Sequence, residues 1–225
     1  MKKILLTGDS RGVGLSIKNL LIERGYQVIG ISRNSKDIKY DLSNIDGIKD
    51  LYNNQIKPLG PIYGFINNAA LAYDDIITNL SSSKLETMYK VNVFSPMMLT
   101  KYMLRDMLLN KTKGSIVHIS SVSAHTGYKG LAMYASTKGA LEAFSKNTAR
   151  EWGVLGIRSN VVCPGFMNTD MSSSLTDKQK TKIFNRNSLK REINTIDVAN
   201  TIEFLISNNS KGITGEIIHV DNGTI

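Results

Sequence analysis

The chain of 225 residues is poor in cysteine, with Cys163 as its only one. A single cysteine excludes an internal disulfide and a cysteine-built metal cluster, and it is typical of a reducing compartment. The longest hydrophobic runs have the length of a strand, too short to span a membrane. The opening MKKILLTG turns to glycine and charge before the apolar part of a signal peptide can form. These absences predict a cytoplasmic protein that is not in a membrane, with Cys163 as a small core residue.

Acidic residues are also in the minority, with 19 Asp and Glu against 28 Lys and Arg and a formal net charge of +9. Such a balance favours anionic partners. The basic residues are dispersed, and the sequence contains neither a basic helix interleaved with aromatics nor another nucleic-acid motif. We therefore expect phosphate-bearing small molecules as partners and no nucleic acid, with a merely solvated basic surface as the alternative.

Short β-rich runs alternate with longer helical patterns along the whole chain. The expected strands are Ile4–Thr7, Gln27–Ile31, Ile62–Ile66, Ser115–Ser120, Arg158–Val162 and Ile217–Val220. The expected helices are Val13–Arg24, Gly47–Gln55, Ser83–Leu109, Met133–Glu151 and Thr195–Leu205. Two of them have start signals: Ser82 is the expected cap of the third, and Thr195 precedes Asp197 in the first turn of the last. This order predicts one α/β domain over residues 1–225, a Rossmann-type doubly wound parallel sheet with helices on both faces. Only nine residues separate Ile31 from Asp41, so that crossover is expected to be a bare loop.

A glycine-rich segment follows the first expected strand and precedes a helix. It reads Thr7-Gly8-Asp9-Ser10-Arg11-Gly12-Val13-Gly14. Glycines permit a sharp turn and let backbone N–H groups approach a pyrophosphate, which then lies at the positive end of the helix. A tight turn without a ligand would use the same residues, but the position between strand and helix favours dinucleotide binding.

The end of the second strand indicates which dinucleotide is bound. An acidic residue there would bind the ribose 2′-hydroxyl, whereas Arg33 offers a permanently charged fork for a 2′-phosphate. Arg11, in the glycine segment, can approach from the other side. The two arginines predict NADPH/NADP+ rather than NAD(H), unless they are solvated surface charges.

The sequence at this point resembles the short-chain dehydrogenase/reductase family, from the first strand to the C-terminus. The stretches that carry the resemblance are Thr7-Gly8-x-x-x-Gly12-x-Gly14, Asp41-Leu42, Asn67-Asn68-Ala69-Ala70, Val-Asn92-Val, Ile-Ser-Ser121-Val, Tyr134-Ala-Ser-Thr-Lys138, Pro164-Gly165 with Thr169, and the ending from Ile213 to Gly223. Within the family, the sequence is most similar to 3-oxoacyl-acyl-carrier-protein reductases. The resemblance departs at Ala70, where glycine is usual, and in the short crossover, which lacks a helix beside the adenine.

The resemblance implies a catalytic tetrad and a set of cofactor-binding residues. The tetrad is Asn92, Ser121, Tyr134 and Lys138. The implied cofactor-binding residues are Thr7, Gly8, Ser10, Arg11, Gly12, Val13, Gly14, Arg33, Asp41, Leu42, Asn68, Ala69, Ala70, Tyr134, Lys138, Pro164, Gly165 and Thr169.

The chemistry of the tetrad follows from its residue types. Tyr134 and Lys138 are four apart on an expected helix, so they share one face. A phenol with a pKa near 10 is a weak acid at neutral pH, and the Lys138 ammonium is expected to lower it. Ser121 would hydrogen-bond the carbonyl oxygen of a substrate, and Asn92 would hold a water that relays protons, as the family likeness implies. Separately, each residue also has a plain structural explanation, such as a helix contact, a strand cap or a surface pair.

The segment 165–191 turns polar and irregular, as expected of a substrate lid. Its apolar residues are Phe166, Met171, Leu175 and Phe184, and its cations are Lys178, Lys180, Lys182, Arg186, Lys190 and Arg191. These features suit an acyl group on an acyl carrier protein or CoA thioester, a nucleotide sugar, or simply a soluble loop. The main hypothesis is therefore an NADPH-dependent 3-oxoacyl thioester reductase. The alternatives are a ketoreductase or alcohol dehydrogenase for a sugar or other small metabolite, and a non-catalytic cofactor sensor; the family likeness also implies a homotetramer or homodimer.

The three histidines do not predict a metal site, because their spacing fits none. His118 and His219 lie in apolar strands, where a hydrogen-bonded packing role is expected. His125 follows Ser121 and is a candidate for the wall of the substrate pocket.

Overall fold

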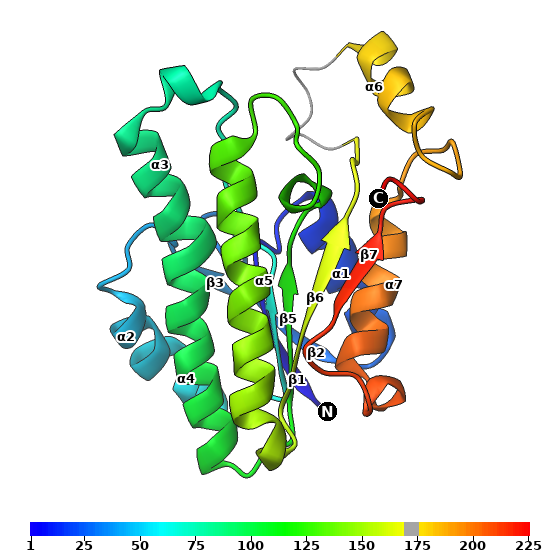
Figure 1. Ribbon diagram of the computed structural model, residues 1–225. Helices are drawn as coiled ribbons and strands as arrows, with labels where there is room; N and C mark the ends of the chain where they lie inside the picture. Colours follow the sequence, from blue (N-terminus) through cyan, green and yellow to red (C-terminus); the bar gives the residue numbers. More distant parts are fainter. Residues whose placement is uncertain (169–175) are drawn as a thin grey trace.

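The computed structural model describes residues 1–168 and 176–225. Within these residues, seven parallel strands form one sheet in the order β3-β2-β1-β4-β5-β6-β7 (Figure 1). The strands are β1 (Lys3–Thr7), β2 (Gln27–Ser32), β3 (Ile38–Lys39), β4 (Gly64–Asn67), β5 (Ser115–Ile119), β6 (Arg158–Pro164) and β7 (Ile217–Val220). This sheet confirms the predicted fold class.

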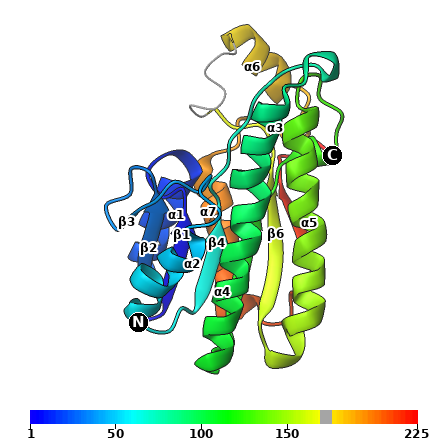
Figure 2. The same cartoon turned by 90° about the vertical axis from the view of Figure 1, so that its left-hand side faces the viewer.

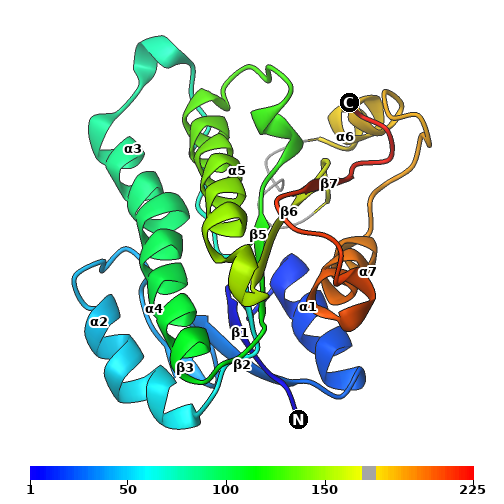
Figure 3. The ribbon, with the colours of Figure 1, turned by 60° about the horizontal axis from the view of Figure 1, so that its bottom comes forward.

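Helices cover both faces of the sheet. They are α1 (Gly12–Glu23), α2 (Ile48–Leu51), α3 (Ser82–Tyr89), α4 (Ser95–Leu109), α5 (Ala132–Trp152), α6 (Asp177–Phe184) and α7 (Thr195–Ile206). Helices α1 and α7 lie on one face, and α2, α4 and α5 lie on the other (Figure 2; Figure 3). None of the helices in the described residues is long and apolar enough to cross a membrane.

The strands are apolar throughout because both of their faces are covered. In β1, Ile4 and Leu6 belong to the core with α1 and α7, while Leu5 between them belongs to the core with α2 and α4. This alternation is the period of two that a pleated strand imposes. The sequence therefore showed the strands by continuous hydrophobicity rather than by alternation.

Several predicted boundaries differ from the structure. The expected strand Ile62–Ile66 is β4 (Gly64–Asn67), and the expected helix Gly47–Gln55 is α-helical only in α2 (Ile48–Leu51). The expected helix Ser83–Leu109 is α3 and α4 joined by a π-helical segment, Lys90–Phe94, that ends just before Pro96 of α4. Helix α3 is capped by Ser81, which accepts from the Lys84 N–H, and not by Ser82. Helix α7 is capped by Asn194 in a capping box with Asp197, so Thr195 is its first helical residue.

The crossover after β2 is short, as predicted, but it contains the two-residue strand β3 at the sheet edge. In place of a helix it holds a polar network. The Lys18 ammonium lies 2.8 Å from the Asp9 carboxylate and 2.7 Å from that of Asp37. Asp9 also accepts the hydroxyls of Ser32 and Ser35, each at 3.0 Å. These contacts tie the crossover to the glycine turn and to α1.

Candidate active site

The carboxyl ends of the strands surround one cavity of about 730 Å³. This is the edge at which parallel α/β sheets bind ligands. The predicted site residues that line it are Gly8, Ser10, Arg11, Gly12, Val13, Gly14, Arg33, Asp41, Leu42, Asn68, Ala69, Ala70, Ser121, Tyr134, Lys138, Pro164 and Gly165. Residues from segments far apart in the chain therefore meet in one space.

The glycine turn is packed closely at Gly8 and Gly14 and open at Gly12, where a ligand could approach. Gly8 has φ +72°, and a Cβ on Gly14 would lie 1.9 Å from the Gly8 carbonyl oxygen. A Cβ on Gly12 would meet nothing within 4 Å, so that glycine borders open space. Helix α1 starts there without a side-chain cap and without an acidic residue in its first turn. Its first N–H groups therefore suit a pyrophosphate, and the turn fits a dinucleotide.

Thr7 supports the turn from below and does not line the cavity. It is fully buried, and its hydroxyl oxygen accepts the N–H groups of Asn68 and Ala69, each at 3.1 Å. Its hydroxyl therefore has a structural role, and its predicted contact with a cofactor stays a prediction. Ala70 does not have a positive φ, so alanine in place of the usual glycine causes no strain. Thr169, another predicted cofactor residue, lies outside the described residues.

The adenosine end of the cavity is lined by Arg11 and Arg33, both exposed. Asp41 lies near Arg33, and its pKa is lowered mainly by the backbone hydrogen bond from Ser43, with a contribution from Arg33. Asp9, just behind this region, is 2% exposed and shares the Lys18 ammonium with Asp37. Lys18 therefore offsets part of a negative charge that would oppose a 2′-phosphate. Sequence reasoning missed this role of Asp9, because its partners lie in other segments.

Ser121, Tyr134 and Lys138 meet at the other end of the cavity. Ser121 follows β5, and Tyr134 and Lys138 lie one turn apart on α5. The Lys138 Nζ donates to the Ile119 carbonyl oxygen at 2.8 Å and lies 5.4 Å from the centre of the Tyr134 ring. A hydroxyl, a phenol and an ammonium therefore face one space, a set suited to protonating an oxygen of a ligand.

The acidities in this group differ from the expectation. Burial lowers the pKa of Lys138 to about 8. Burial raises the pKa of Tyr134 well above its usual value, and the hydrogen bond with Ser121 only partly opposes this effect. The predicted lowering of the Tyr134 pKa by Lys138 is therefore not found in the protein alone, because desolvation of the phenolate outweighs the hydrogen bond with Ser121.

Asn92 lies in the π-helical segment, fully buried, and does not line the cavity. Its carbonyl oxygen accepts the Leu71 N–H at 2.8 Å, and its amide donates to the Leu71 carbonyl oxygen at 2.8 Å and to Thr137 at 3.0 Å. The side chain thus joins the loop after β4 to α5. The side chain therefore has a positioning role, and the predicted role of Asn92 in holding a water stays a prediction.

One of the three histidines lies as expected and the other two do not. His118 is fully buried beside Phe144, with its pKa lowered to about 3 by burial, which confirms its packing role. His219 is exposed on the edge strand β7 and not packed in the core. His125 is not among the cavity residues. Its ring faces Glu142, at 3.0 Å, and the ring of His219.

Several residues that line the cavity were not predicted. Among them are Tyr73, Asp74, Tyr128, Lys129, Leu131, Met167 and Ile183. They come from the loops after β4, β5 and β6 and from α6, and their sequence has no motif that marks them. In the segment 165–191, which was predicted to be irregular, the described residues include helix α6. Its Ile183 lines the cavity, and the ring centroids of Phe166 and Phe184 lie 5.6 Å apart. The role of this segment as a substrate lid stays a prediction.

Fold and site together define the class of dinucleotide-dependent oxidoreductases, and comparisons with known proteins specify the family. A family model described as Enoyl-(Acyl carrier protein) reductase matches residues 8–224. The 3-oxoacyl-[acyl-carrier-protein] reductase FabG of Vibrio cholerae serotype O1 is 31% identical, over 99% of this chain and 96% of that protein. The chain belongs to the short-chain dehydrogenase/reductase family and is an oxidoreductase.

Two solved structures show how far the similarity extends in space. The structure of 4-hydroxyisoleucine dehydrogenase complexed with NADH has a TM-score of 0.93 and 26% identity, covering 100% of this chain and 98% of that one. The structure of ElxO with NADP bound has a TM-score of 0.90 and 25% identity, and the match covers 99% of this chain and 98% of that one. These two relatives were solved with different dinucleotides, so the family by itself does not determine the cofactor.

Proposed function

We propose that this chain uses NADPH to reduce a ketone to a secondary alcohol, with a 3-oxoacyl thioester as the substrate. The observation that carries the proposal is that Ser121, Tyr134 and Lys138 line the same cavity as the glycine turn. Dinucleotide binding and proton chemistry therefore share one space. A cofactor sensor would need the turn but would have no use for the three side chains.

The residues of this cavity act on the oxygen of the substrate. When bound, the reduced nicotinamide supplies hydride to the carbonyl carbon. Tyr134 gives its proton to the carbonyl oxygen, and the Ser121 hydroxyl donates a hydrogen bond to the same oxygen as negative charge develops. Lys138, held by the Ile119 carbonyl oxygen, stabilises the phenolate that Tyr134 becomes. Asn92 positions α5, and with it Tyr134, through its bond to Thr137.

NADPH is favoured over NADH by the charges at the adenosine end. Arg11 and Arg33 line the cavity there, and the Lys18 ammonium contacts the nearby carboxylates of Asp9 and Asp37. Arginine forks suit a phosphate, and Arg33 follows β2 where an acidic residue would hold a free ribose hydroxyl. The Asp9 carboxylate, which reaches the end of β2, is already bonded to Ser32, Ser35 and Lys18.

An acyl thioester on an acidic carrier is favoured by the lid. Helix α6 contributes Ile183 to the cavity wall, and Phe166 contacts Phe184 beside it. The outer surface of the lid carries the exposed cations Lys178, Lys182, Arg186, Lys190 and Arg191. An apolar wall with a cationic rim matches an acyl chain that is delivered by an acidic protein or a CoA phosphate. The FabG relative acts on such a substrate by its name, whereas the 4-hydroxyisoleucine dehydrogenase supports the small-metabolite alternative.

The test measures the oxidation of NADPH or NADH by the purified protein with a panel of substrates. The panel contains acetoacetyl thioesters, keto-sugars and simple ketones, and a crotonoyl thioester that reports enoyl reduction. We expect the 3-oxoacyl thioester with NADPH to give the highest kcat/KM. The Tyr134→Phe variant should lose about 10²- to 10⁴-fold in kcat while binding NADPH normally. Tyr128→Phe, which changes another tyrosine of the cavity, is the matched control and should lose less than about threefold. Wild-type turnover by Tyr134→Phe would refute the catalytic assignment.

We also propose a homotetramer, in which helices α4 and α5 and strand β7 form the contacts. Large apolar side chains are exposed on and beside α4, namely Phe94, Leu108 and Leu109. Exposed apolar surface of this kind is typical of subunit contacts. Light scattering of the purified protein would give the mass of the assembly, and a monomeric mass would contradict the proposal.

A further inference from the structure

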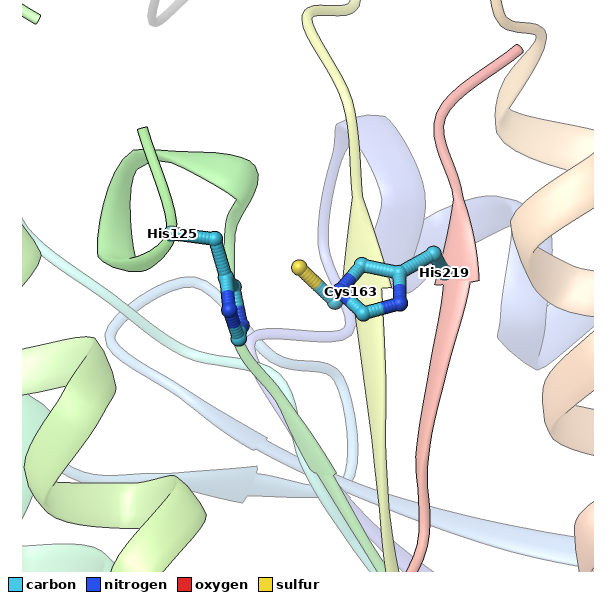
Figure 4. A group of neighbouring side chains, drawn as sticks. All are labelled: His125, Cys163 and His219. Atoms are coloured by element: carbon cyan, nitrogen blue, oxygen red, sulfur yellow. The ribbon is translucent and has the colours of Figure 1, made fainter. Parts of the chain in front are cut away.

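Three side chains with metal-binding atoms meet beside the proposed active site. They are His125, Cys163 and His219, and one potential ligand atom of each lies within 4.8 Å of the others. His125 follows β5, Cys163 lies on β6 and His219 on β7, and the three side chains point toward one another (Figure 4). The whole chain contains only three histidines and one cysteine. Most of its nitrogen and sulfur ligands thus gather at one point.

We propose that His125, Cys163 and His219 bind a borderline divalent transition metal ion such as Zn²⁺. This site does not depend on the proposed reductase function. Two imidazoles and a thiolate are ligands for zinc and its neighbours, whereas Mg²⁺ and Ca²⁺ require oxygen ligands. In a tetrahedral zinc site the ligand atoms are about 3.5 Å apart, as follows from metal–ligand distances of about 2.0–2.3 Å. The 4.8 Å spacing therefore needs only small rotations of the two exposed histidines.

The surroundings of His125 support this assignment. Its Nε2 lies 3.0 Å from the Glu142 carboxylate, whose other neighbour is the Ser120 hydroxyl. Carboxylates hold metal-binding histidines in this way, because they fix the orientation and tautomer of the ring. In the tautomer that donates from Nε2, the lone pair of the ring lies on Nδ1 and is available to a metal.

Access in the single chain also fits a metal ion. Cys163 is fully buried and forms the floor, while the two histidines are exposed in the single chain and form the rim. On binding, the thiol loses its proton to the solvent as the sulfur–metal bond forms, and nothing is oxidised or reduced. The cluster stands just outside the cavity, since Ser123 and Pro164, which flank it in sequence, line the cavity wall. A bound ion would therefore join the loops that carry Ser121 and Gly165.

The test uses Co²⁺ as a coloured replacement for Zn²⁺ on the chelator-treated full chain, without NADPH. A thiolate-to-cobalt absorption band can arise only from Cys163, because the chain has no other cysteine. We expect this band to reach its limit at one equivalent of Co²⁺ and to disappear when Zn²⁺ is added. Failure to observe the band with the wild-type protein would overturn the proposal, whatever the variants do.

Variants assign the other two ligands. Cys163→Ser should remove the band, and His125→Gln and His219→Gln should each weaken Co²⁺ binding by at least about tenfold. Glu216→Gln, which removes an exposed carboxylate just before β7, is the matched control and should bind as the wild type does. Circular dichroism and activity without metal verify the fold of the His219→Gln protein. A folded His219→Gln protein with unchanged affinity would exclude His219 from the site and refute the three-residue assignment.

Discussion

Replacement of Lys18 by methionine tests whether the polar network substitutes for the missing crossover helix. Lys18 contacts Asp9 at 2.8 Å and Asp37 at 2.7 Å, and the Asp9 side chain is only 3% exposed. Removal of one partner of a buried ion pair costs about 3–5 kcal/mol. Because Lys18 is 17% exposed and Asp9 keeps its two serine donors, we expect a smaller loss of about 2–3 kcal/mol.

A loss of this size should lower Tm by about 4–12 °C in a protein of this length, as measured by calorimetry or circular dichroism. The uncompensated charge of Asp9 should also raise KM for NADPH by about tenfold, and KM for NADH by less. The double variant Asp9→Asn/Lys18→Met should recover at least half of the lost stability, since an amide needs no counter-charge. Lys36→Met, at an exposed lysine of the same crossover, is the control and should change stability by less than about 0.5 kcal/mol. An unchanged Tm for Lys18→Met, or no recovery in the double variant, would refute the reasoning.

Three further predictions follow from single positions. Because burial lowers the pKa of Lys138 to about 8, the rate of reduction should fall above about pH 8. Between about pH 8 and pH 10.5 the unfolded state binds more protons than the folded state. The free energy of unfolding should therefore rise with pH across that window, by at most about 3 kcal/mol. A pH-independent rate from 7 to 10 would contradict this. Asn92→Ala should lower Tm by several degrees and should change kcat more than KM, because it breaks three hydrogen bonds of a fully buried side chain. An unchanged Tm would exclude the positioning role. In Gly30→Ala the new Cβ would lie 1.9 Å from the Asp9 carboxylate, so we expect the free energy of unfolding to fall by at least about 2 kcal/mol. The control Gly153→Ala, whose Cβ would meet nothing within 4 Å, should be neutral. Equal stabilities of the two variants in urea would count against the close packing of Asp9.

The site was predictable from the sequence wherever its parts are local. The glycine turn is specified within eight residues, because its positive φ angles and close contacts admit only glycine. Tyr134 and Lys138 share a face through helical periodicity alone. The carboxyl ends of parallel strands necessarily meet at one edge, which brought Ser121 and Pro164 to the same cavity as the turn.

The sequence by itself determined the α/β order, the parallel sheet and the local motifs, since periodicity and turn chemistry are properties of neighbouring residues. Only the tertiary structure decided what Asp9, Asn92 and Thr7 do, because their partners come from segments distant in the chain. The same holds for the meeting of His125 with His219, which depends on the register of β7 against β6. The pKa of Tyr134 was likewise beyond the sequence, because burial and not the neighbouring lysine decides its direction.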